Sequence, residues 1–478
     1  MAAKLKPNQA NAHPSKNFFV NMLVRDIDLT DTLLDLLDNC VDGILRNTDP
    51  DPTAPHPYKG YWANFVIGPD YFELDDNCGG IPLELAQTKA FAIGKPQPIT
   101  GADAKATVGM YGIGMKRAIF KLGRNATVRT WSDQPLDVTI SAKWLDSDSW
   151  SALPLRELDE ADFTHKGTKV AVTDLNPSVK REFDGGAFVD AFERRISSIY
   201  ALIIAKGFSV TVRREVGKPV PAPVQAKPFA LLLSSKPATS DVIAPIVYKG
   251  RLLGVDVELY AGLYRRLPDQ EETDADDAGK NRSDDAGWTI ACNDRVVVDR
   301  DRTWVTGWGE AAVPSFHNQF IAISGLLLLS SDHPERLPLT TTKRGVDHGT
   351  ALYSLVKEMM REATKKLTDF TNKWKRFEGD LNDLYKRGAQ LTSLVELRAV
   401  AETMPTRSWA RNDQVEVFMP KLPTPPRDMS HARISFVADK NDVKKLALVY
   451  FEDPNAKAKD VGQQAFREEL ALYAEAAE

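Results

Sequence analysis

Three separated segments near the start of this chain constrain its fold more than any other feature of the sequence. The first is a helical run with acidic positions, 33–45, and the second is a turn rich in aspartate and glycine, 76–82. The third is a glycine-rich stretch, 109–116, that leads into another helical run. Each segment predicts a local structure by itself, but their order and spacing carry more information than any one of them.

The first segment places polar residues on one face of an otherwise apolar helix. Asp35, Asn39 and Asp42 fall at i, i+4 and i+7, within about 60° of one another, while leucine and valine occupy the other faces. A carboxylate there can orient or deprotonate a water, and the amide oxygen of Asn39 suits a hard Mg²⁺ that also holds phosphate oxygens. The same pattern is typical of an amphipathic surface helix with a solvated acidic stripe.

The second segment follows a strand-like run, Tyr71–Leu74, and turns on residues that supply positive φ angles: Asp76, Asn77, Gly79 and Gly80. Asp76 can accept a hydrogen bond from an exocyclic amine such as that of adenine. Taken alone, the segment is also explained as an ordinary turn, because Asp-Asn and Gly-Gly pairs occur at turns in any fold.

In the third segment, Gly109, Gly112 and Gly114 leave bare backbone N–H groups ahead of a predicted helix, 115–122, that ends at Gly123. A helix N-terminus with its partial positive charge would then lie beside any phosphate held by the loop. The glycine order is neither the dinucleotide fingerprint nor the Walker pattern. A phosphate loop and a plain glycine cluster both fit this segment.

Together with the strand-like Gly167–Val170, the three segments resemble the four sequence boxes of the GHKL ATPases. That class contains gyrase B subunits, MutL, ninety-kilodalton heat-shock chaperones, histidine kinases and MORC proteins. The resemblance implies an α/β sandwich of the Bergerat type with the nucleotide between sheet and helices. It also implies that Asp35 is the general base and that Asn39 binds Mg²⁺. Asp76 would read adenine.

The resemblance further implies that the second glycine box wraps the phosphates of ATP under a mobile lid, which would lie within 83–108. The residues predicted to contact ATP or its metal are Asn39, Asp42, Asp76, Gly80, Ile81, Gly109, Tyr111, Gly112, Ile113, Gly114, Met115, Lys116 and Thr168.

Two positions depart from the family pattern. Asp35 stands where the family usually has glutamate, one methylene longer, so water activation is expected to be slower or altered in geometry. Cys78 stands where the first glycine of the Asp-x-Gly-x-Gly turn is expected, and Gly80 is the surviving match. Neither change removes a phosphate or metal group, and the site is predicted to be functional.

A second resemblance concerns the segments Gly287–Val298, Phe320–Leu329 and Leu337–Arg344. They look like the transducer domain, with its ribosomal-protein-like fold, that follows the ATPase domain in MutL, gyrase, type IIB topoisomerases and MORC proteins. In that domain a loop lysine reaches back to the γ-phosphate, and Lys343 is the candidate here. A compact ammonium on a flexible stem suits that role. The alternative is that Lys343 and Arg344 are ordinary loop charges.

Composition agrees with a chain of several domains. The 478 residues are 43% hydrophobic and 27% charged, values typical of soluble globular proteins. A formal net charge of −5 argues against a protein that coats nucleic acid indiscriminately, although a local basic surface remains open. Lys116, Arg117, Lys121 and Arg124 are spaced as helix-face and cap charges, which favours solvation or phosphate proximity over DNA contact.

Targeting signals and metal-ligand spacings are not evident. The apolar run Phe320–Leu329 is too short to cross a bilayer, and the opening residues lack an apolar core of signal-peptide length. We therefore expect a cytoplasmic protein without a membrane partner. The three cysteines, Cys40, Cys78 and Cys292, lie far apart and are most simply reduced thiols.

Four regions are predicted along the chain. Residues 1–16 form a flexible arm, 17–215 the ATPase domain, 227–348 the transducer domain with a disordered acidic loop at 269–285, and 350–478 a helical C-terminal region. The fold class is α/β (α+β).

The resemblance implies a Mg²⁺-dependent, slow ATPase that acts as an ATP-gated homodimeric clamp. MORC-like ATPases of this kind are found in bacterial antiviral defence and chromatin silencing, so DNA is one expected partner. The alternative is a chaperone or an ATP-binding interaction module that acts on a protein client. The aspartate at position 35, where the family usually has glutamate, keeps this alternative open. A histidine kinase is disfavoured, because no helical histidine followed by an acidic residue precedes the boxes.

Overall fold

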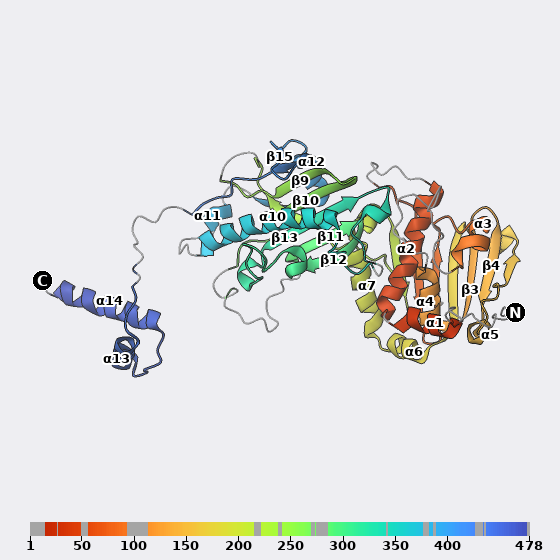
Figure 1. Ribbon diagram of the computed structural model, residues 1–478, viewed down its shortest axis with the longest axis horizontal. Coiled ribbons are helices and arrows are strands. Elements are labelled where there is room, and N and C mark those ends of the chain that lie inside the picture. The colour runs from red at the N-terminus through yellow and green to blue at the C-terminus, as the bar shows by residue number, and fades with distance from the viewer. Residues whose placement is uncertain are drawn as a thin grey trace, which may run out of the picture. The chain divides into compact units, whose positions relative to one another are not determined.

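A computed structural model, shown in Figure 1, describes most of the chain. The described residues are 15–25, 27–48, 56–92, 113–214, 221–237, 241–268, 273, 285–340, 343–375, 382–385, 389–425, 434 and 436–475. The chain divides into two compact units, 1–425 and 426–478, which are described separately. In the described part of the chain, no helix is long and apolar enough to cross a membrane.

The first sheet has seven strands in the order β5-β4-β3-β6-β2-β1-β7. Their bounds are β1 Trp62–Ile67, β2 Tyr71–Asp76, β3 Gly123–Trp131, β4 Pro135–Ile140, β5 Leu155–Glu157, β6 Gly167–Leu175 and β7 Ser209–Arg213. All neighbours are antiparallel except β1 and β7, which run parallel. The strand predicted at Tyr71–Leu74 is confirmed, and the alternation of buried and half-buried side chains along β2 is that of a sheet with one covered face.

Helices cover this sheet. They are α1 Lys16–Arg25, α2 Leu29–Thr48, α3 Leu83–Leu85 with the π-helical turn η1 Ala86–Ala90, α4 Gly114–Leu122, α5 Ala142–Asp146, α6 Pro177–Asp184, α7 Ala187–Ile199 and α8 Ala201–Ala205, with a 3-10 turn η3 Glu160–Asp162. The leucines of α2 enter the same core as β1 and β2. Helices α2 and α4 pack side by side (Figure 1). The helix predicted at 115–122 is confirmed as α4.

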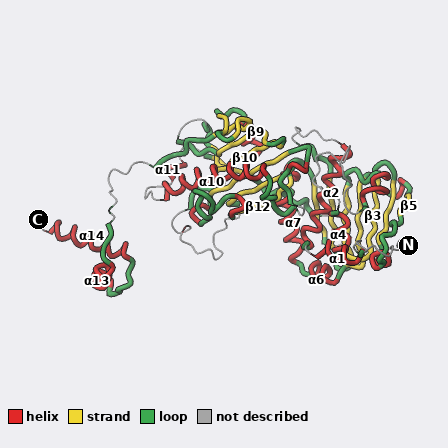
Figure 2. Tube along the Cα trace, in the orientation of Figure 1, coloured by secondary structure: helices red, strands yellow, loops and turns green. Residues whose placement is uncertain are grey.

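The second sheet also has seven strands, in the order β12-β11-β13-β10-β9-β16-β15. Their bounds are β9 Ile246–Leu252, β10 Val255–Leu263, β11 Gly287–Cys292, β12 Arg295–Asp301, β13 Ile323–Ser330, β15 Arg407–Trp409 and β16 Asn412–Phe418, and β8 Ala230–Leu233 pairs separately with β14 Gln390–Ser393. The long helix α10, Ala351–Lys375, runs across β9, β10 and β13 (Figure 2).

We refer to the parts of the 1–425 unit built on the first and the second sheet as its two halves. The second half also contains shorter elements: α11 Asn382–Tyr385, α12 Leu394–Ala401, and the 3-10 turns η4 Trp304–Thr306, η5 Asn318–Phe320 and η6 Pro334–Arg336. The two halves of the 1–425 unit meet where α7 and α8 pack against β12. A single apolar cluster includes Phe192 and Ile203 from the first half together with Val296 from the second.

The class is mixed α/β, as predicted, but two boundaries differ from expectation. Lys16, assigned to a flexible arm, begins α1 and is fully buried, with its ammonium on the carbonyl of Trp144; residues 1–14 of that arm lie outside the described residues. The region 350–478, predicted to be helical, contains β14, β15 and β16 as well as helices. In β16 the buried Val415 and Val417 alternate with exposed residues, a period-two pattern that the abundance of lysine and glutamate nearby obscured.

The 426–478 unit contains two helices, α13 Lys440–Phe451 and α14 Ala458–Glu475, both in regions predicted to be helical. They pack on each other through the buried Ala447 and Val461. The acidic loop 269–285 lies almost wholly outside the described residues.

Candidate functional site

The acidic face of α2 is buried. Asp35, Asp38 and Asp42 are 5%, 0% and 7% exposed, whereas Asn39 is exposed. The alternative interpretation, a solvated acidic stripe on a surface helix, is therefore wrong for these carboxylates. Buried carboxylates need partners, because burial penalises the charged form.

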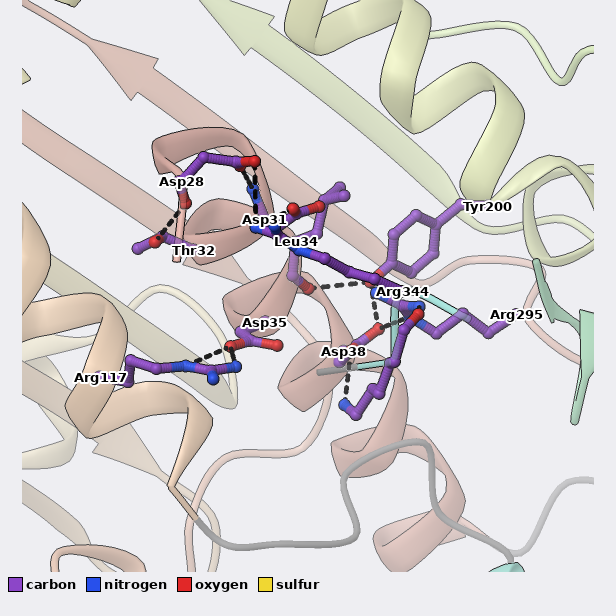
Figure 3. A network of polar contacts seen from close by, with 11 residues as sticks. Asp28, Asp31, Thr32, Leu34, Asp35, Asp38, Arg117, Tyr200, Arg295 and Arg344 are labelled. Atoms are coloured by element: carbon purple, nitrogen blue, oxygen red, sulfur yellow. Dashed lines mark hydrogen bonds and ion pairs between the residues drawn. The ribbon is translucent and has the colours of Figure 1, made fainter. Parts of the chain in front are cut away.

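Asp35 is held by α4. The guanidinium of Arg117, itself buried, donates through Nε at 3.1 Å and through Nη2, and both contacts end on Oδ2 of Asp35 (Figure 3). Gly114, the first residue of α4, lies against the same carboxylate: a Cβ at Gly114 would be 3.4 Å from Cβ of Asp35. Of the two expectations for Arg117, solvation is wrong, and proximity to a phosphate stays a prediction.

Asp76 ends β2 and is also buried, 5% exposed. Its Oδ1 accepts from the backbone N–H of Cys78 at 2.8 Å and of Thr168 at 3.3 Å, and its Oδ2 accepts from Sγ of Cys40 at 3.4 Å. Burial raises the pKa of Asp76 to about 6, although these hydrogen bonds oppose the shift. Near neutral pH Asp76 is a buried, mostly ionised acceptor.

Close backbone approaches fix the turn after β2. A Cβ at Gly43 of α2 would come within 2.7 Å of the Cys78 carbonyl oxygen, and one at Gly167 within 1.8 Å of the Asp76 carbonyl oxygen. Gly80 has φ +67° and lies against the carbonyl of Trp131. The half-buried Ile81 donates its N–H to Oγ1 of Thr130 at 2.7 Å. Glycine at these positions lets α2, the turn and β6 meet.

The described part of the glycine-rich segment starts at Ile113. Ile113, Gly114 and Met115 are half-buried at the start of α4, and Lys116 is buried with its Nζ 2.9 Å from the carbonyl oxygen of Ala90. Gly109, Tyr111 and Gly112 lie outside the described residues, as does most of the lid predicted at 83–108; its described part contains α3 and η1.

Lys343 comes to α2 from the other half of the unit. It lies in a turn closed by a bridge between Leu339 and Val346, is 8% exposed, and places Nζ 2.5 Å from Oδ2 of Asp38. Lys343 is therefore not an ordinary loop charge, and it lies within one helical turn of Asp35. Its ammonium contacts Asp38, a residue that the sequence interpretation did not select.

Two further side chains hold Asp38. Nε of Arg295, at the start of β12, lies 2.7 Å from Oδ1, and the hydroxyl of Tyr200 donates to the same oxygen (Figure 3). Burial pushes the pKa of Asp38 up, but Arg295 and Lys343 more than offset this and hold it below its usual value. Asp38 is a fully buried, ionised carboxylate.

A second contact between the halves lies about two turns earlier on α2. Arg344 pairs with Asp31, and its Nη2 lies 3.1 Å from Oδ2 of the exposed Asp28. Burial, followed by the neighbouring Asp28, raises the pKa of Asp31 to about 6 even though Arg344 opposes the shift. The consecutive residues Lys343 and Arg344 therefore contact α2 at Asp38 and at Asp31, about two turns apart.

The residues missed from sequence were Asp38, Arg117, Arg295 and Tyr200. Asp38 had a detectable signal, because on a helix it falls within about 60° of Asp35 and about 40° of Asp42, on the same polar face. The other three left no local signal, since each reaches α2 from an element distant in the sequence. No family model matches this chain, and no curated protein was found to be similar to it.

Proposed function

We propose that this protein binds ATP with Mg²⁺ and hydrolyses it slowly, as a member of the GHKL class. One observation carries the proposal. Four segments that the sequence spreads between residues 35 and 168 meet beside α2, through contacts of Gly43 with Cys78, of Gly114 with Asp35, and of Asp76 with Thr168. A plain surface helix, turn and glycine cluster would not require these contacts.

The residue types at this meeting point fit the proposed ligand. The buried Asp76 can accept a hydrogen bond from an exocyclic amine, beside the backbone of Thr168. The exposed amide of Asn39 lies one residue from Asp38 and four from Asp35, so it is available to a metal ion. Bound Mg²⁺ would neutralise phosphate charge and orient the terminal phosphate. The backbone at the start of α4 adds donors beside Asp35.

Asp35 is proposed to act as the general base. Both contacts from Arg117 end on Oδ2, and Oδ1 would orient and deprotonate the attacking water. Arg117 fixes the direction of the carboxylate and occupies one of its two oxygens, which leaves Oδ1 as the atom that would act as base. The shorter side chain and the guanidinium together account for the slow turnover that we propose.

Phosphate release and nucleotide binding by matched variants test this proposal. Asp35→Ala should retain Mg²⁺-dependent ATP binding and lower turnover by about 10²-fold or more, whereas Asn39→Ala should lose both. Asp70→Ala removes a mostly exposed carboxylate from the turn between β1 and β2 and is the control, expected to match the wild type. Unchanged phosphate release in Asp35→Ala would falsify the assignment of the base.

ATP-dependent homodimerisation and clamping are proposed from the family resemblance. Sedimentation with a non-hydrolysable ATP analogue tests the dimer, and a chain that sediments identically with and without it contradicts the clamp. Retention on circular but not linear plasmid in the presence of the analogue would support a DNA clamp. No retention at low salt would favour a protein client instead.

A further inference from the structure

The contacts around Asp38 are unbalanced in charge. One carboxylate receives two cations, Arg295 and Lys343, and the side chains of all three are less than 10% exposed. The trio therefore carries a surplus of one positive charge while Asp38 is ionised. A surplus charge away from water is unfavourable, and a nearby anion would relieve it.

Lys343 is the more easily released of the two cations. Arg295 is fixed twice, through Nε to Oδ1 of Asp38 and through Nη1, 2.9 Å from the backbone carbonyl oxygen of Lys343. The ammonium of Lys343 contacts the other oxygen, Oδ2, at the end of a flexible stem. If Lys343 left, Asp38 would still keep Arg295 and the hydroxyl of Tyr200 on Oδ1.

The backbone of Lys343 is held in a strained conformation. Its φ is +54°, in the left-handed region that residues with a side chain seldom occupy. The N–H of Lys343 donates to the carbonyl of Thr340 at 2.9 Å, and the carbonyl oxygen of Lys343 accepts from Nη1 of Arg295. These contacts fix the base of the side chain near α2, so that rotation of the stem alone can move the ammonium between neighbouring acceptors.

The terminal phosphate of ATP, bound beside Asp35, would be a second acceptor within reach of Lys343. Asp35 and Asp38 are separated by about 4.5 Å along the helix axis, which is less than the length of a lysine side chain. We propose that Asp38 is a positioning residue that serves as the resting counter-ion of Lys343 and competes for it with the terminal phosphate of ATP. This inference rests on the proposed ATP function. Because ADP lacks that phosphate, competition at Asp38 would set how strongly the protein discriminates ATP from ADP.

The ratio of ATP to ADP affinity, measured by calorimetry with Mg²⁺, tests this role. Asp38→Asn keeps the shape of the side chain but removes the competing charge, so the ratio should rise by about tenfold. Lys343→Ala should bring the ratio toward one, and the double variant should match Lys343→Ala. Asp137→Asn removes a buried carboxylate from another ion pair, with Arg156 on β4 and β5, and should leave the ratio unchanged.

A merely structural role for Asp38 would weaken ATP and ADP binding alike, and an unchanged ratio in Asp38→Asn would overturn the inference. If that variant does not fold, Tyr200→Phe serves instead. It removes one donor from Asp38, which should then hold Lys343 more tightly and lower the ratio about threefold; no decrease would count against the inference. Failure of the wild type to bind ATP at all would overturn the proposed function and this inference together.

Discussion

The two halves of the 1–425 unit distribute charge in opposite ways. The first half buries carboxylates on α2 and at the end of β2, and supplies Arg117 to Asp35. The second half buries an apolar sheet under α10 and contributes Arg295, Lys343 and Arg344 at one end. The difference teaches that Asp38 of α2 takes its cations from the other half, so the charge of Asp38 is balanced by the contact between the two halves.

The largest effect is expected where backbones of the first half meet. Gly167→Ala would push a methyl group into the Asp76 carbonyl, so it should lower the free energy of unfolding by at least about 2 kcal/mol and abolish nucleotide binding. Gly345→Ala, in the turn of Lys343, has open space around the added methyl and should change stability by less than about 0.5 kcal/mol. Chemical denaturation of both variants measures this contrast, and equal destabilisation would contradict it.

A second effect concerns the cation that the second half supplies. Lys343→Ala should lower ATP turnover by about 10²-fold with little change in ADP affinity, because the ammonium addresses only the terminal phosphate. Steady-state phosphate release and ADP titration measure the two quantities. Equal loss of ADP and ATP binding would instead indicate a folding defect. That outcome would mean that Lys343 stabilises the contact between the two halves and does not address the terminal phosphate.

The sequence was informative about the parts of this molecule that local patterns encode. The polar face of α2, the strand before Asp76 and the start of α4 follow from helical and strand periodicity and from glycine placement. The partners of the carboxylates could not be predicted in the same way. Arg295 and Asp38 are separated by 257 residues, and tertiary packing, including that of α7 and α8 on β12, brings them together.

Burial was the second limit of sequence reasoning. A helix with apolar residues on most of its surface and acidic residues on one face resembles a surface helix, and only tertiary structure shows that these carboxylates are buried. The strands β15 and β16 were missed for a related reason, because short strands among charged residues give a weaker signal than the long helix α10 before them.

A third prediction uses the raised pKa of Asp76. Its carboxylate is a stronger acceptor when ionised than when protonated, so ATP affinity should fall below pH about 6, by at most about tenfold per pH unit. The folded-state pKa lies above the unfolded value, so ionisation costs stability as pH rises from about 4 to about 6. Asp76→Asn should therefore gain stability relative to the wild type across that window, and its weakened ATP binding should show no step near pH 6.

The smallest effect is expected at the exposed side of the contact between the halves. Arg344→Ala should lower stability by no more than about 1 kcal/mol at pH 8, because Arg344 is partly exposed and its pairs are screened. Arg344 stabilises only the ionised form of Asp31, whose pKa is about 6. The cost should therefore shrink as pH falls through 6, leaving a remainder from the pair with Asp28.

Arg251→Ala removes an exposed ion pair with Asp256 within the second sheet and is the matched control for Arg344→Ala. Thermal denaturation between pH 5 and 8 should show almost no cost for Arg251→Ala and no step near pH 6, because this pair connects two strands of the same half. If the two variants behave alike, Arg344 contributes no more than an ordinary surface charge. Arg344 would then add nothing to the contact that Asp38 and its partners make between the halves.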